Sequence, residues 1–392
     1  MTAVASILQQ RLLEPLTRRP CTLLGVGPMS RSCVEAAIEV ANVHDVPLML
    51  IASRRQIDAR ELGGGYVENW STEELAAFVH QRDKRGHIFL SRDHGGPWQG
   101  NHEPTAEMSL HDAMARAKTS FEADIAAGFS VIHIDPSLGA AEVTSADVVW
   151  RVAELYDFCW TAARRAGRDI VFEIGTEEQS ATSGSLDELD AMLDQVRDVC
   201  DRGGLPLPVF VVAQTGTKVV ERRNVGSMAS PYRVDGELPA EIHVPKLIRL
   251  LNRHGVHLKQ HNTDFLSDDV LAWIPRLGVH SANVAPEFGQ VETLAIVDTA
   301  RDKGLGDLAD RFLAVALESG KWHKWVLPES QMTEFDRAVI AGHYVFATPT
   351  GREAIAAIES GLAKRGVDLG ERRRTAVRGA IERYMRNFRL IA

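Results

Sequence analysis

The sequence is poor in cysteine. Its 392 residues include four cysteines, Cys21, Cys33, Cys159 and Cys200, which lie far apart and form no CxxC pair. This spacing argues against a structural zinc knot and against a disulfide framework. We therefore expect four reduced, buried thiols.

Long apolar runs and an excess of positive charge are also missing. The amphipathic, arginine-bearing segment 7–20 lacks the apolar run of about 7 to 15 residues that a secretory signal needs. A composition of 45% apolar and 25% charged residues does not indicate a membrane span. The net charge of -9 and the pI near 5.9 argue against nucleic-acid binding. We expect a cytoplasmic protein with neither membrane nor nucleic acid as a partner.

What the sequence does contain is a series of short apolar or β-branched runs whose C-terminal ends turn polar. Eight of them follow one another, at residues 22–27, 46–53, 87–94, 130–137, 170–177, 208–216, 256–264 and 277–287. The stretches between them have the 3.6-residue apolar spacing of helices, most clearly at 113–128 and 145–167. The chain therefore predicts a strand and then a helix, eight times.

Alternation of this kind indicates a parallel sheet, and eight units indicate closure into a TIM (β/α)8 barrel. An open doubly wound sheet is the alternative, but the turn after the first strand reads GVGPMSRS and contains no GxGxxG fingerprint. We predict an α/β barrel domain over residues 1–303. Residues 304–392 are predicted to form a helical C-terminal extension.

Catalytic groups of such barrels project from the C-terminal ends of the strands. The polar residues at these ends are Asp93, His94, Asp135, Glu173, Glu177, Gln214, His261, Asp264, Asn283 and Glu287. Two histidines with oxygen ligands nearby can hold zinc or manganese and leave a position open for substrate. The alternative is that His94 and His261 are hydrogen-bonded barrel histidines. We expect His133, in the middle of its strand, to be a packed interior residue rather than a ligand.

Asp93 has a further possible role beside His94, because a carboxylate next to a metal-bound carbonyl can move a proton on a substrate hydroxyl. A salt bridge with Arg92 is the alternative. Glu177, just past the fifth strand, is a candidate for a second acid or base. Asp135, after the fourth strand, is another candidate for this catalytic role.

Two loops carry cations that can bind a substrate. The loop after the second strand combines Arg54 and Arg55 with three consecutive glycines and suits a flap over the site. The loop after the sixth strand contains Lys218, Arg222 and Arg223, which are placed to hold an anionic group. Glycine and arginine are also ordinary loop residues, and an ordinary solvated loop explains the second composition equally well.

Taken in order, these motifs resemble the Z-subunit family of class II tagatose-bisphosphate aldolase, which also includes sugar-phosphate 4-epimerases. The resemblance covers roughly the first 300 residues. It is carried by residues 35–53, by GGGY at 63–66 and by RDHGGPW, AGFSVIHIDPS, EIGTEE, VVAQTG, HNTD and ANVAPE.

The family in turn is similar to the zinc-dependent class II fructose-bisphosphate aldolases. That likeness implies a divalent metal, zinc or alternatively manganese, with His94, Glu173 and His261 as ligands. It also implies that Asp93 is the acid/base and that Gln214 stands where those aldolases have a third histidine. Substrate contacts are expected from the strand ends and loops, at Arg54, Gln214, Lys218, Asp264, Asn283 and Glu287.

Two departures from the aldolase pattern affect the substrate. The segment HNTDFLSDD after the seventh strand is acidic and lacks the glycines that seat a phosphate in those aldolases, so phosphate binds elsewhere or is absent. The C-terminal region follows the family only loosely.

The resulting hypothesis is a metal-dependent 4-epimerase of a ketose or ketose phosphate, of the tagatose or fructose 6-phosphate type, which works by retro-aldol cleavage and re-addition. An aldolase that releases the aldehyde is the first alternative. A non-catalytic subunit that stabilises a separate aldolase chain is the second. We expect a small carbohydrate as the ligand and assembly into a homo-oligomer, or with an aldolase partner.

Overall fold

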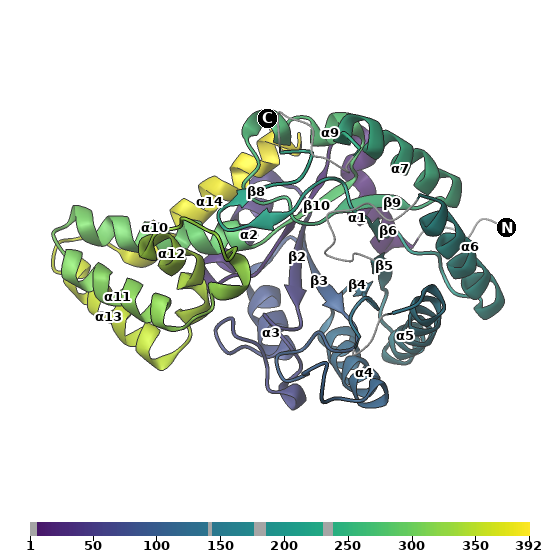
Figure 1. Ribbon diagram of the computed structural model, residues 1–392, viewed down its shortest axis with the longest axis horizontal. Coiled ribbons are helices and arrows are strands. Elements are labelled where there is room, and N and C mark those ends of the chain that lie inside the picture. Colours follow the sequence, from purple (N-terminus) through teal and green to yellow (C-terminus); the bar gives the residue numbers. More distant parts are fainter. Residues whose placement is uncertain (1–5, 140–142, 176–185, 230–237) are drawn as a thin grey trace.

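The computed structural model describes residues 6–139, 143–175, 186–229 and 238–392. Eight strands form a closed barrel, which Figure 1 shows with its surrounding helices. They are β1 (Leu23–Val26), β2 (Leu48–Ser53), β3 (Ile88–Gly95), β4 (Val131–Ile134), β5 (Val171–Gly175), β6 (Phe210–Val212), β9 (His257–Gln260) and β10 (Ser281–Val284). Each predicted run coincides with one of them, and only β3 extends beyond its run, by one residue. The predicted TIM barrel is therefore confirmed.

Every neighbouring pair in the barrel is parallel, and β1 closes the barrel by pairing with β10 from Leu23 opposite Ser281 to Val26 opposite Val284. β1, β4 and β6 are buried along their whole length. Because strands of this kind are covered on both faces, their sequences are nearly continuous apolar runs. Parallel pairing brings all eight C-terminal strand ends to one face of the barrel.

Helices surround the barrel. Those that precede, connect or directly follow the strands are α1 (Ile7–Arg18), α2 (Arg31–His44), α3 (Thr72–Arg82), α4 (Leu110–Ala127), α5 (Ser145–Ala166), α6 (Leu186–Gly203), α7 (Ala240–His254), α8 (Asp268–Leu271), α9 (Ile274–Leu277) and α10 (Pro286–Asp302), with the short 3-10 helix η1 (Arg60–Leu62). Capping boxes begin α3 at Ser71 and α5 at Thr144. The loop after β6 forms a hairpin of β7 (Val219–Val220) and β8 (Arg223–Asn224).

The C-terminal part is helical, with α11 (Gly306–Glu318), η2 (His323–Trp325), α12 (Glu334–Val345), α13 (Pro349–Ala363) and α14 (Leu369–Asn387). Figure 1 shows α11 and α13 projecting to the left of the barrel, whereas α14 runs back along it. Phe312, Val339 and Ile358 belong to a second core that these helices share with the end of α10. Ile381 and Tyr384 of α14 belong to the barrel core. The boundary at residue 303 stays a prediction, and we propose that α14 belongs with the barrel.

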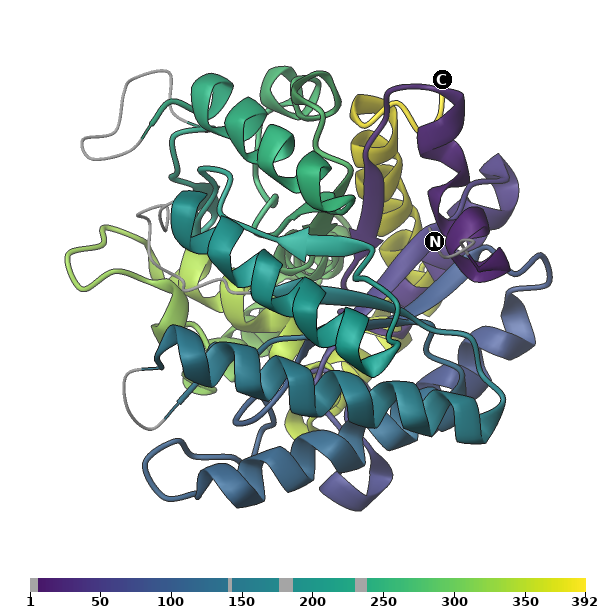
Figure 2. The same cartoon turned by 90° about the vertical axis from the view of Figure 1, so that its right-hand side faces the viewer.

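The segment between α1 and β1 lies beside the C-terminal end of the chain (Figure 2). Thr22 N donates to Phe388 O at 3.0 Å, and Arg19 Nη2 donates to Leu390 O at 2.7 Å. All four cysteines are free and buried, as predicted. Within the described residues we find no helix with the length and apolarity that crossing a membrane requires.

Candidate active site

Four buried side chains from four strands of the barrel meet at its C-terminal face. Asp93 of β3, His133 of β4, Glu173 of β5 and His261, which follows β9, each place a potential ligand atom within 4.8 Å of the other three. Oδ1 of Asp93 lies 3.6 Å from His133 Nδ1 and 3.6 Å from His261 Nε2. Oε1 of Glu173 lies 3.6 Å and 3.5 Å from the same two nitrogens. We call these four residues the strand-end cluster.

The strand-end cluster fits a divalent metal. Ligand atoms about 2.1 Å from a tetrahedral zinc ion stand about 3.4 Å apart, close to the separations seen here. Glu173 is 0% exposed, and its Oε1 forms no hydrogen bond with any described residue. A buried carboxylate oxygen without a hydrogen bond is unfavourable unless a cation or a proton occupies the space it faces. The arrangement therefore has the donor types, burial and spacing of a metal site.

His94 lies beside the strand-end cluster and is itself partly exposed. Its ring centroid is 5.0 Å from that of His261 and 5.4 Å from that of His133, and its side chain is 35% exposed. The backbone at His94 has a φ of 45°, a conformation that a non-glycine residue adopts only when its surroundings impose it. Nδ1 of His94 bonds Oδ2 of Asp135 at 2.7 Å. A carboxylate on one ring nitrogen fixes the ring and leaves the other nitrogen for a metal or substrate.

The carboxylates of this region are ionised at neutral pH. Burial raises the pKa of Asp93, but the charges of His94 and His261 outweigh it and hold that pKa well below its ordinary value. Burial also raises the pKa of Asp135, but the hydrogen bond and the charge of His94 outweigh burial and lower that pKa to about 2. These groups can bind a cation or accept a proton without first losing one.

Two members of the region were not expected from the sequence. His133, which we expected only to fill the interior, is 1% exposed and also belongs to the strand-end cluster. Lys259 of β9 is equally buried, and its Nζ bonds Glu173 Oε2 at 2.6 Å. Burial raises the pKa of Glu173, but Lys259 and then His133 lower it to about 2. Side chains two residues apart on a strand share a face, so the position of Lys259 relative to His261 carried a usable signal.

The predicted catalytic and substrate contacts divide into two groups. Asn283 is close to the strand-end cluster, because its Nδ2 donates to Asp93 Oδ1 at 3.2 Å. Asp135 holds His94 and also accepts from Gln99 Nε2 at 2.9 Å, which makes it a positioning group. Arg54, in contrast, is 0% exposed and pairs with Asp58 and Glu103, so its guanidinium does not face open space.

The remaining predicted residues have structural contacts or lie further out. Oδ1 of Asp264 accepts from Ala285 N and Glu287 N and so caps α10. Burial and then Glu287 raise the pKa of Asp264 to about 7. Glu287 binds α14 through Arg383 Nη1 at 3.2 Å and through Tyr384.

Oε1 of Gln214 accepts from the backbone N–H groups of Gly216 and Thr217, so it stabilises the turn that follows β6. Lys218 is exposed on the same loop. Glu177 lies outside the described residues. The substrate-binding roles of all these residues stay predictions.

The fold and the strand-end cluster define a (β/α)8 barrel with a candidate metal site at the face where barrel enzymes place their catalytic groups. Residues 13–198 match the model of the GatZ/KbaZ-like family, described as D-tagatose-1,6-bisphosphate aldolase subunits. The resemblance inferred from the sequence motifs is therefore confirmed for this part of the chain.

One relative by sequence and two solved structures show what the chain is similar to. A D-tagatose 6-phosphate 4-epimerase of Agrobacterium fabrum is 23% identical over 332 residues, which cover 80% of this chain and 76% of the relative. The structure of a probable tagatose 6 phosphate kinase from Sinorhizobium meliloti matches with a TM-score of 0.76 at 19% identity, covering 93% of this chain and all of the other. The fructuronate-tagaturonate epimerase UxaE from Cohnella laeviribosi matches with a TM-score of 0.60 at 12% identity, covering 94% and 81% of the two chains.

The two structural similarities concern the fold, and the sequence relative concerns the enzyme group. The family match and the sequence relative agree with the prediction that the chain is an enzyme related to sugar-phosphate epimerases and aldolases.

Proposed function

We propose that the protein is a metal-dependent 4-epimerase of a ketose phosphate, of the tagatose or fructose 6-phosphate type. The observation that carries the proposal is the strand-end cluster, in which buried histidines and ionised carboxylates converge on one point of the barrel mouth. The similarity to a D-tagatose 6-phosphate 4-epimerase over 80% of the chain supports the reaction type.

We propose zinc as the metal, with manganese or another divalent ion as the alternative. His94, His261 and Glu173 are the proposed ligands; His133, which belongs to the strand-end cluster with Glu173 and His261, is a further candidate donor. A bound divalent ion would polarise the ketone oxygen of the sugar and stabilise negative charge that develops there. Lys259 would hold Glu173 in position from the opposite side.

Asp93 is the proposed acid/base. Its carboxylate takes the proton of the C4 hydroxyl while the bond between C3 and C4 breaks, which leaves an aldehyde at C4 and an enediolate over C2 and C3. The aldehyde turns over, C3 adds to its other face, and Asp93 returns the proton to the new C4 alkoxide. Bonds and protons balance without any oxidant. Asn283, bonded to Asp93 Oδ1, would keep the carboxylate aimed at the hydroxyl.

An aldolase would use the same groups and release the aldehyde instead of re-adding it. The family description as aldolase subunits favours this second candidate and keeps association with a separate aldolase chain as a possible assembly, next to a homo-oligomer. A subunit without catalytic activity has no physical need for the buried ligand set that the described residues contain.

The test is incubation of the metal-loaded protein with tagatose 6-phosphate, fructose 6-phosphate and the two free ketoses, followed by NMR. Interconversion of the two phosphates is the expected result. Triose products in place of the epimer would identify an aldolase. Absence of any product, with protein that holds its metal, would leave only the stabilising-subunit role.

A further inference from the structure

The segment around η2 lies over the barrel mouth. Glu221 N, in the hairpin after β6, donates to Trp325 O at 2.8 Å. On the other side Trp325 Nε1 donates to Tyr344 OH at 3.1 Å, and the Tyr344 ring lies 4.8 Å from that of Tyr66 in the loop after β2. The C-terminal helical part thus bridges loops that follow two opposite strands of the barrel.

Each side of this bridge carries a cation without an ion pair among the described residues: Arg55, whose backbone O accepts from Tyr66 N at 3.2 Å, and Lys324. Arg55 is exposed two residues after the end of β2, and Lys324 reaches solvent with its Nζ 4.8 Å from the Trp325 ring and 5.2 Å from the Tyr344 ring. Partial burial and then the charges of Arg55 and Lys321 lower the pKa of Lys324 to about 8. Within the described residues no carboxylate pairs with Arg55 or Lys324. Like charges held together in this way favour a bound anion.

A buried histidine without hydrogen bonds lies beside them. His343 of α12 is 2% exposed, and neither of its ring nitrogens has a hydrogen-bond partner among the described residues. Its ring is 4.0 Å from that of Tyr344, and burial and then Lys324 lower its pKa to about 3. A side chain at Gly289, in the first turn of α10, would collide with the His343 ring. His343 therefore lies against the rim of the barrel mouth with unused polar atoms.

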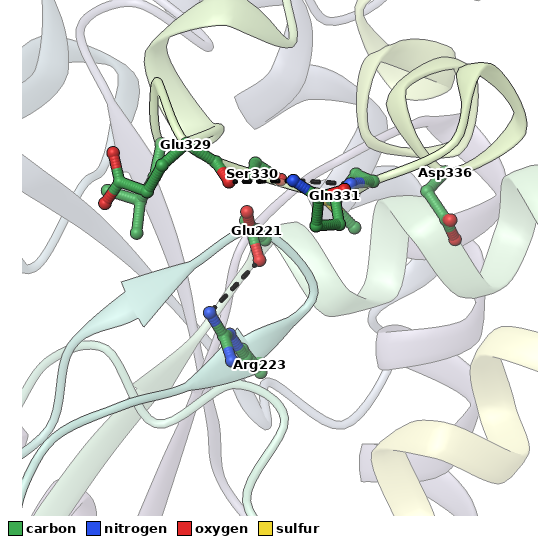
Figure 3. Close-up of a pocket in the computed structure, with 8 residues that line it drawn as sticks. Glu221, Arg223, Glu329, Ser330, Gln331 and Asp336 are labelled. Atoms are coloured by element: carbon green, nitrogen blue, oxygen red, sulfur yellow. Dashed lines mark hydrogen bonds and ion pairs between the residues drawn. The ribbon is translucent and has the colours of Figure 1, made fainter.

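Two of the three cations that the sequence placed on the loop after β6, Arg222 and Arg223, already have carboxylate partners. Arg222 pairs with Asp336 at 2.8 Å, and Arg223 pairs with Glu221 at 3.4 Å. Figure 3 shows the cavity of about 540 Å³ beside them, which is lined by Glu221, Glu329 and Asp336 against the single cation Arg223. Its acidic lining does not suit a phosphate.

We propose that Arg55 and Lys324, together with His343 and Tyr344, form the subsite for the phosphate of the sugar. The inference rests on the proposed function, because the phosphate in question is that of the ketose phosphate. It explains why the segment after β9 dispenses with phosphate-binding glycines. Two cations match the two charges of a phosphate monoester, and Arg55 can bind two of its oxygens at once. The C-terminal part then completes the substrate site.

The test compares Arg55→Ala and Lys324→Ala with two matched controls in the metal-loaded full chain. Arg276 of α9 and Lys364, next to the end of α13, are exposed and have no ion pair among the described residues. Binding of inorganic phosphate is measured by calorimetry, and acetate is measured in the same way to find out whether the site binds a carboxylate equally well. KM is measured for tagatose 6-phosphate and for tagatose. We expect Arg55→Ala and Lys324→Ala to weaken phosphate binding and to raise KM for the phosphorylated sugar by about 10- to 100-fold.

In the same experiment the KM for tagatose should stay unchanged, and Arg276→Ala and Lys364→Ala should resemble the wild type in every measurement. The phosphate subsite is overturned if the wild type does not bind phosphate, if it binds acetate equally well, or if Arg55→Ala and Lys324→Ala affect tagatose and its phosphate alike. Failure of the epimerase proposal looks different: phosphate binding is lost in the two variants, but the wild type converts neither sugar.

Discussion

Replacing Lys259 by methionine removes the cation that faces Glu173 inside the barrel. Both side chains are 1% exposed and their charged atoms are 2.6 Å apart. Breaking a buried pair of this kind by removing one partner costs about 3 to 5 kcal/mol, because the other charge stays buried without compensation. The unfolding entropy of a 392-residue chain is about 0.8 kcal/mol per kelvin, so the expected decrease in Tm is about 4 to 6 °C.

The stability that Lys259→Met loses should become smaller as the pH falls. In the wild type Lys259 helps to lower the pKa of Glu173 to about 2, so the pair stabilises the fold above the unfolded pKa and is lost only as the pH falls toward 2. Without Lys259 the pKa of Glu173 rises, and the carboxyl takes up a proton on mild acidification. The difference in stability between variant and wild type should therefore narrow from pH 7 to pH 5.

Calorimetric scans of chelator-treated and metal-loaded protein measure these effects. A metal bound at Glu173 supplies the missing positive charge, so the metal-loaded variant should lose less stability than the chelator-treated one. The double variant Lys259→Met with Glu173→Gln removes both charges and should recover much of the loss. A single variant as stable as the wild type at pH 7 without metal, or a double variant no better than the single one, would refute the reasoning.

Three further predictions follow from the strand-end cluster and the bridge over the mouth. Asp93→Asn should keep its metal and its Tm while turnover decreases by about 10²- to 10⁴-fold; loss of metal would make Asp93 a ligand instead. His261→Ala and His133→Ala should each lower the metal content measured by elemental analysis, and unchanged content in His133→Ala would return His133 to a packing role. Lys324 faces Arg55, Lys321 and the buried His343, and its pKa is about 8. Because Lys324 loses its charge above this pH, kcat/KM for the phosphorylated sugar should decrease as the pH rises through 8. Lys324→Arg should move that decrease to higher pH, and an unchanged profile would contradict the prediction.

The barrel and its functional face could be predicted because the signal is local. Each barrel strand is a short apolar run with a polar end, and parallel closure brings those ends together whatever the loops contain. Asp93 and His261 were found in this way. His133 was assigned to packing alone, although it points to the same face as Asp135, two residues further along the chain.

The contacts of the loops could not be predicted, because they depend on residues far away in the sequence. Arg54 forms an ion pair with Glu103, and Arg55 is the exposed arginine of the two. No residue close to Arg54 in the sequence indicates this pairing. Glu287 lies just past the end of β10, in the first turn of α10, but its partners Arg383 and Tyr384 come about a hundred residues later, from α14. The position of Lys324 over the mouth likewise depends on how the C-terminal helices fold back.

The central claim, epimerisation at C4 through cleavage of the bond between C3 and C4, is tested most directly by running the reaction of tagatose 6-phosphate in D₂O and reading the product by NMR. The C4 hydrogen stays on its carbon throughout cleavage and re-addition. The account therefore predicts fructose 6-phosphate that carries no deuterium at C4. Deuterium at C4, or no fructose 6-phosphate from metal-loaded protein, would contradict it.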